Sequence, residues 1–167
     1  IFVGYLVNFF DFKFLQLIEM VGWTTLIFGI ILGVSDKINI KKNYQPKLKE
    51  SIIIGIFQSL ALIPGVSRSG IVITIGRFLG HSRSSSSKFS LFLSIPAILG
   101  ATTLKSLNVI SNESIYFTND IAIGFCLSFI FAFFTIKIFM NYIEKASLQI
   151  FVIYRIILGI IILYLVY

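Results

Sequence analysis

This sequence has few charged residues and almost no cysteine. Charged side chains make up 13% of its 167 residues and hydrophobic ones 57%, whereas an average soluble domain is about 25% charged. There are too few polar side chains to cover a soluble globule, which excludes a cytosolic enzyme, a disordered tail and a secreted domain. The single cysteine, Cys126, excludes a disulfide framework and a cysteine-based metal site. We therefore expect an integral membrane protein.

The charge that is present is mostly basic. Lysine and arginine together number 14, against 7 aspartate and glutamate residues, and such an excess is found in many nucleic-acid-binding proteins. Here, however, the cations do not form one stripe. They lie between apolar runs, where cytoplasmic loops of membrane proteins carry lysine and arginine. We therefore expect the bilayer as a partner and no nucleic acid.

Long apolar runs occupy much of the chain. Because a spanning helix needs about 20 mostly apolar residues, we expect helices near 15–34, 89–104 (interrupted by Pro96), 121–140 and 148–166. The chain opens on an apolar segment without an initiator methionine, so we expect residues 1–167 to be a single membrane domain truncated at its N-terminus. Arg155 lies inside the last run, where it is either a functional charge or an interfacial anchor.

One apolar stretch is broken in the middle. Its halves, 52–63 and 71–80, are each too short to cross a bilayer. The break at 64–70 contains a proline and two glycines, and it is tolerated at membrane depth only where protein or water surrounds it. Both flanking loops are basic, which predicts that both ends are cytoplasmic and that the segment is re-entrant. The loop at 106–120 and the C-terminus are then outside.

The break combines the groups that a phosphate site needs. Arg68 offers a planar fork of donors, and Ser67 and Ser69 add hydroxyls on either side of it. Gly65 and Gly70 allow close approach of the backbone. A helix starting at residue 71 would point its free N–H groups at the loop. The alternative is a glycine- and serine-rich kink whose Arg68 pairs with a carboxylate from a neighbouring helix.

Histidine is too scarce to indicate metal chemistry. The only one, His81, follows the second apolar half in a loop, with no second histidine and no carboxylate near it in the sequence. We expect it to be non-catalytic.

Three segments together resemble one known family. The run FQSLALIPGVSRSG at 57–70, then GHSR at 80–83 and FSLFLSIPAILGA at 89–101, closely resemble the undecaprenyl-diphosphatase, or bacitracin-resistance, family. The IYR run at 153–155 is also similar to it. The resemblance covers nearly all of this chain but only the C-terminal part of the family's usual length.

The resemblance implies an all-α fold: a polytopic membrane helix bundle with a re-entrant broken helix, forming the second half of an inverted-repeat fold. It also implies a phosphatase that converts undecaprenyl diphosphate to undecaprenyl phosphate and inorganic phosphate. This reaction recycles the lipid carrier of peptidoglycan synthesis in the bacterial inner membrane and confers resistance to bacitracin. Arg68 would clamp the diphosphate, with Ser67 and Ser69 as hydrogen-bond donors. The implied substrate-binding residues are Gly65, Gly70 and Gln58.

The resemblance further implies a divalent cation, magnesium or calcium, and a polyprenyl diphosphate partner, although no ligand cluster for a cation is visible. The family's first motif, which is rich in glutamate and leads to a serine- and histidine-containing run, is absent. Ile71-Val72 and Lys88 also depart from the common pattern. We therefore expect this chain alone to be inactive. Two other hypotheses stay open: a transporter or binder of a phosphate anion, and a non-catalytic membrane subunit.

Overall fold

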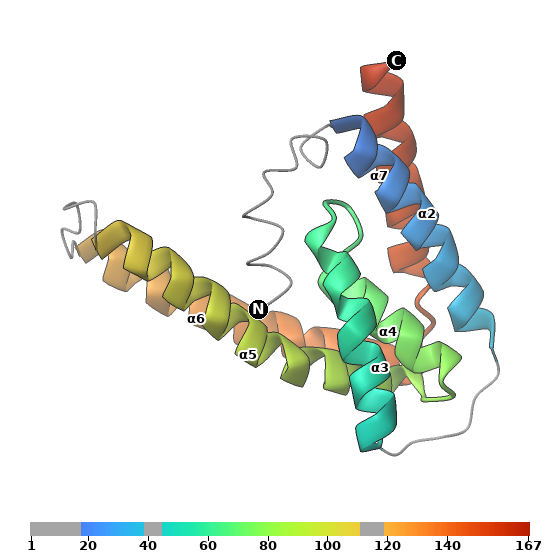
Figure 1. Cartoon of the computed structure of the whole chain (residues 1–167), viewed down its shortest axis with the longest axis horizontal. Coiled ribbons are helices and arrows are strands. Elements are labelled where there is room, and N and C mark those ends of the chain that lie inside the picture. Colours follow the sequence, from blue (N-terminus) through green and yellow to red (C-terminus); the bar gives the residue numbers. More distant parts are fainter. Residues whose placement is uncertain (1–17, 39–44, 111–118) are drawn as a thin grey trace.

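The computed structural model describes residues 18–38, 45–110 and 119–167, and within these ranges all of the regular structure is helical. The elements (Figure 1) are α2 (Ile18–Lys37), α3 (Leu48–Gln58), the short 3₁₀ helix η2 (Ser59–Leu62), α4 (Arg68–Phe78), α5 (Arg83–Ile110), α6 (Asn119–Lys145) and α7 (Gln149–Val166). The expected all-α class is confirmed.

In the described part of the chain, three helices are long and apolar enough to cross a membrane: Ile18–Lys37, Ile121–Lys145 and Gln149–Val166. They cover the stretches expected at 121–140 and 148–166 and the described part of 15–34; residues 15–17 lie outside the described residues. Helix α5 covers the helix expected near 89–104 and continues through Pro96. Membrane helices tolerate proline where neighbouring groups satisfy the freed backbone carbonyl.

Helices α2 and α7 form the most closely packed pair. Gly22, Gly29 and Gly33 of α2 all lie against α7, and Gly159 of α7 lies against Leu26. A Cβ added to Gly29 would lie 3.0 Å from the Cβ of Arg155, closer than ordinary contact. Small residues at such spacing let membrane helices approach each other. This packing sets Arg155 deep between the helices.

The broken segment folds back on itself. Helix α3 with η2 leads to the break, and α4 returns beside α3, so that the start of α3 and the end of α4 lie at the same end of the molecule (Figure 1). This is the arrangement that a re-entrant segment requires. The halves expected at 52–63 and 71–80 correspond to 48–62 and 68–78.

Helices α5 and α6 form a hairpin that projects away from the other helices (Figure 1). Every residue from 121 to 138 of α6 is exposed, including Phe125, Phe129 and Phe131. An apolar helix surface of this kind suits a hydrocarbon environment, where helical backbone groups are already satisfied.

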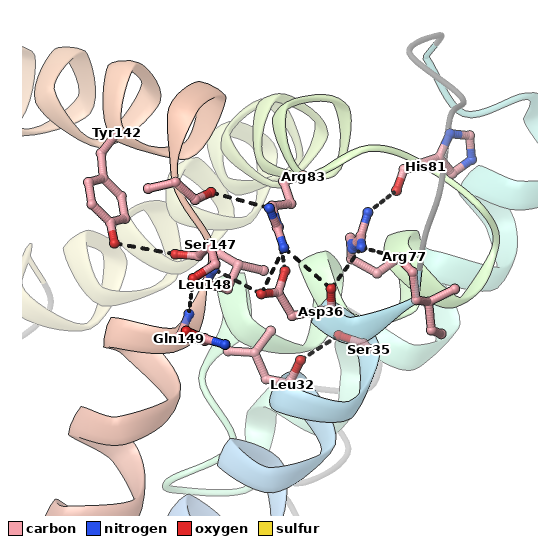
Figure 2. Close-up of polar contacts among 12 residues, drawn as sticks. Leu32, Ser35, Asp36, Arg77, His81, Arg83, Tyr142, Ser147, Leu148 and Gln149 are labelled. Carbon is pink, nitrogen blue, oxygen red and sulfur yellow. Dashed lines mark hydrogen bonds and ion pairs between the residues drawn. The ribbon is translucent and has the colours of Figure 1, made fainter.

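Polar contacts join the helix ends opposite the break. The Asp36 carboxylate accepts hydrogen bonds from Arg83 and, at 3.1 Å, from the backbone N–H of Leu148 (Figure 2). Arg77 donates to the backbone oxygens of Asp36 and His81. The end of α2, the turn before α5 and the turn before α7 are therefore held together at one end.

This arrangement makes the predicted topology testable by cysteine labelling. In a Cys126→Ala background, Lys49→Cys and Lys88→Cys should react with a membrane-impermeant thiol reagent from the same side, because both exposed positions lie at this end. Asn112→Cys, in the loop expected outside, should react only from the opposite side. Labelling of positions 49 and 88 from opposite sides would mean that the broken segment crosses the bilayer.

Candidate active site

Ser67 is the residue immediately before helix α4. Its Oγ accepts a hydrogen bond from the backbone N–H of Gly70 at 3.2 Å, which makes it the N-cap residue. The helix therefore starts at Arg68, and the expected start at residue 71 is wrong by one turn. Ser67 has a φ of 70°, in the left-handed region that non-glycine residues seldom occupy and that often marks functional sites. Its hydroxyl lies 3.5 Å from that of Ser69.

Helix α2 holds the start of the break. Thr24 Oγ1 donates to the carbonyl of Pro64 at 2.6 Å, and Thr25 Oγ1 to that of Gly65 at 3.4 Å. Gly65 has a φ of 87°, and a Cβ at this position would collide with Thr24 Oγ1. Gly65 is therefore required by the packing of the break against α2. The two threonines are visible in the sequence as polar residues inside an apolar run, but their partners are not.

Arg155 holds the break from the other side. Its side chain is buried, and Nη2 donates to the carbonyls of Gly65 at 2.6 Å and Val66 at 2.9 Å. Its Nη1 lies so close to Gly70 that a Cβ there would be 2.7 Å away. The interpretation of Arg155 as an interfacial anchor is therefore wrong. The only indication in the sequence was the charge itself.

A cleft of about 410 Å³ opens beside the break. One wall is the polar break itself, through Gly65, Ser67, Ser69 and Gly70. The remaining lining is largely apolar and includes Leu32, Ile73, Phe139, Leu148, Phe151 and Leu158. The cleft therefore places hydroxyl groups and free helix N–H groups next to a surface suited to hydrocarbon.

Two of the expected site residues do not line this cleft. Arg68 is exposed in the first turn of α4, beside Ser67, and makes no hydrogen bond or ion pair with any described residue. The alternative in which it pairs with a neighbouring carboxylate is therefore not seen in the described residues. Gln58 ends α3, and its buried Oε1 has no hydrogen-bond partner among the residues described.

The electrostatics of the break favour an anion. Arg68 and Arg155 flank it, and the α4 N-terminus adds a partial positive charge. The cleft-lining residues within 18–38, 45–110 and 119–167 include no carboxylate and no histidine. A positive helix end with an arginine in its first turn is unfavourable unless a negative group lies nearby.

The described residues do not fit a divalent cation at this site. Hard cations such as magnesium and calcium take carboxylate and carbonyl oxygens as ligands. Here the carbonyls of Pro64, Gly65 and Val66 already accept hydrogen bonds. No group of three histidine, cysteine or acidic residues gathers anywhere in the described ranges.

His81 has an acidic partner that the sequence does not reveal. Its Nε2 lies 3.2 Å from the Glu50 carboxylate, although residues 50 and 81 are far apart in the sequence. The imidazole is fully buried, connects the start of α3 to the turn before α5 and does not line the cleft. The expectation that it is non-catalytic stays a prediction.

Comparison with known proteins yields one family. The family model described as "Bacitracin resistance protein BacA" matches residues 1–161. The undecaprenyl-diphosphatase of Pelagibacter ubique (strain HTCC1062) is 48% identical over 152 residues, covering 90% of this chain and 59% of the relative. That of Campylobacter curvus (strain 525.92) is 43% identical over 146 residues, covering 87% and 55%. The chain therefore spans somewhat more than half the length of these curated relatives.

Proposed function

The chain belongs to the bacitracin-resistance protein family, and from this premise we propose that it supplies the diphosphate-binding part of an undecaprenyl-diphosphate phosphatase. The reaction converts undecaprenyl diphosphate and water to undecaprenyl phosphate and inorganic phosphate, in the bacterial inner membrane. The observation that carries the proposal is the break at 64–70. There Ser67 and Ser69, at the start of α4, face a cleft whose remaining lining is largely apolar.

The two-sided lining of the cleft suits a lipid diphosphate. A polyprenyl diphosphate has a charged end and a long hydrocarbon chain, and the cleft offers a polar break on one side and side chains such as Phe139 and Phe151 on the other. We place the phosphates at Ser67, Ser69 and the α4 N-terminus, with the first isoprene units against the aromatic wall. Ligand sites of this kind combine a mainly apolar lining with few polar groups.

The described groups can bind the substrate and stabilise developing charge. Arg68 provides a bidentate fork for phosphate oxygens, and the Ser67 and Ser69 hydroxyls can donate to others. Preorganised donors of this kind contribute mainly to the stability of the transition state. Hydrolysis also needs a group that takes a proton from the attacking nucleophile. Among the described residues that line the cleft, none is a carboxylate or a histidine, so we assign that group to the part of the full-length enzyme that this chain does not span.

The implied magnesium or calcium ion belongs with that same part. The oxygen atoms around the break do not suit such an ion, so no step of the mechanism uses a metal bound to the described residues.

A second candidate function, binding or transport of a phosphate anion without hydrolysis, is favoured by the lack of a proton acceptor among the described residues of the cleft lining. Discontinuous helices also form such sites in transporters.

Phosphate release distinguishes the two functions. The purified 167-residue chain should not release inorganic phosphate from undecaprenyl diphosphate in detergent, whereas the chain supplied with the N-terminal half of a full-length relative should. An Arg68→Ala chain should fail in both forms. If the reconstituted form binds the lipid but never hydrolyses it, the binder or transporter is favoured. If the isolated chain is active and Arg68→Ala abolishes that activity, the assignment of the proton acceptor is wrong.

A further inference from the structure

A second cavity lies at the opposite end of α4 from the break. It has a volume of about 830 Å³ and is lined by residues of α2, α4, α5, α6 and α7 and by Gln45 and Ser82. Helix α4 has 11 residues, so at 1.5 Å per residue the two sites are about 16 Å apart. We call this space the basal cavity. Its lining includes Asp36, Arg77 and Arg83, whose polar contacts Figure 2 shows. The cavity lies at the end that the lysine-rich loops predict to be cytoplasmic.

The charges that line the basal cavity do not balance. Four cations, Lys37, Arg77, Arg83 and Lys88, face two carboxylates, Asp36 and Glu144. The Asp36 carboxylate already accepts hydrogen bonds from Arg83 and from the Leu148 N–H. Glu144 lies 3.6 Å from Lys88 at the surface. Among the described residues that line the cavity, the cations therefore exceed the carboxylates by two.

Arg77 is the buried member of this set. It is only 4% exposed, and its terminal nitrogens donate to the carbonyls of His81, Asp36 and Ile38. Its Nε is buried and has no hydrogen-bond partner among the described residues. Burial lowers the pKa of Arg77; the nearby Asp36 opposes this and the nearby Arg83 adds to it. Arg83 hydrogen-bonds the Asp36 carboxylate, whereas Arg77 donates to the backbone carbonyl of Asp36.

Other groups around the cavity favour a negatively charged occupant. Helices α5 and α7 both begin at this cavity, with Ser84, Ser85 and Gln149 in their first turns. Helix N-termini carry partial positive charge and are common anion-binding positions. Basic cavities between membrane helices on the cytoplasmic side bind the head groups of anionic lipids.

From these observations we propose that the basal cavity binds a phosphate group, supplied by an anionic lipid head group or by free inorganic phosphate. The cavity is large enough for either, and the excess positive charge, the buried Arg77 and two helix N-termini all point to a phosphate-bearing anion. This site is separate from the break and does not depend on the proposed hydrolysis.

Binding is best measured in the Arg68→Ala chain, so that phosphate at the break contributes least. Arg68 is exposed and makes no contact on which the fold depends, so this background should remain folded. Isothermal titration calorimetry measures the affinity for inorganic phosphate. Native mass spectrometry with phosphatidylglycerol, compared with phosphatidylcholine, measures the binding of an anionic lipid head group. Lys37→Ala/Lys88→Ala is the test variant, because both side chains are exposed and neither holds the helix ends together. Lys137→Ala, an exposed lysine of α6, is the control.

The double variant should bind the effective probe at least about tenfold more weakly than the Lys137→Ala control, because each basic side chain adds a modest share of the attraction. Binding of phosphatidylglycerol alone would assign the site to a lipid head group. Binding of inorganic phosphate alone, or of both probes, would show that free phosphate is accepted. If neither probe binds, or if the double variant and the control bind equally, the proposal is wrong.

Discussion

Replacing Arg68 with lysine should lower kcat of the chain reconstituted with the N-terminal half of a relative by roughly 100-fold, the effect typical of losing one preorganised donor to developing charge. Arg68 is exposed beside the Ser67 cap and has no partner among the described residues, so its planar fork is free for phosphate oxygens. Lysine keeps the charge but cannot bind two oxygens in the same fixed geometry. Phosphate release measured over a range of substrate concentrations separates kcat from KM.

The matched control is Lys49→Ala, which removes an exposed cation at the start of α3, away from the break. Its activity should equal that of the unmodified protein. Because Arg68 is exposed and makes no hydrogen bond or ion pair with a described residue, thermal stability should be the same in both variants, and a loss of activity can be attributed to the chemistry. If Arg68→Lys has near-normal kcat, Arg68 is not the main phosphate ligand.

Replacing Arg155 with methionine should also lower kcat by about 100-fold, a loss that misplacement of a site by about 1 Å can produce. The substitution removes the donor of the Val66 carbonyl and leaves the Gly65 carbonyl with only the 3.4 Å hydrogen bond from Thr25. A buried carbonyl without a partner costs about 1–3 kcal/mol. The break should therefore shift, and with it the Ser67 hydroxyl that begins α4. Arg155 acts through the loop, so we regard it as a positioning residue.

A purely structural role for Arg155 would reduce the amount of folded protein without changing kcat per folded molecule. Activity is therefore normalised to folded protein, and kcat and KM are measured separately. Arg155→Lys, which keeps one donor group, should restore part of kcat. Ile157→Met, which changes an exposed residue of the same helix, is the control and should be unchanged. Normal kcat per folded Arg155→Met molecule would contradict the positioning role.

Much of the fold could be predicted from local properties of the chain. The length and composition of apolar runs predict membrane helices wherever they occur, because crossing a bilayer depends on the segment itself. The positions of α6 and α7 follow in this way. The break follows from Pro64 together with Gly65, whose left-handed φ ends the helical path. Proline alone is not sufficient, because Pro96 lies inside α5.

The site could be predicted only in part. Arg68, Ser67 and Ser69 are next to one another in the sequence, so their grouping needs no tertiary structure. The sequence pattern predicts that α4 starts at residue 71, because Gly70 is a poor helix former. The Ser67 cap instead starts the helix at Arg68. A cap is a single hydrogen bond, and whether it forms depends on a backbone angle that the sequence does not specify.

The sequence by itself determined the class of protein, the approximate helices, the break and the basic and hydroxyl side chains at it, because hydrophobicity, proline and charge act over a few neighbouring residues. Only the tertiary structure decided that Arg155 holds the break from 90 positions away, that Glu50 reaches His81 and that Asp36 joins three helix ends. These contacts arise from glycine-mediated packing of α2 on α7 and from the return of α4 beside α3. Hydrogen bonds between distant segments form only after those helices have packed.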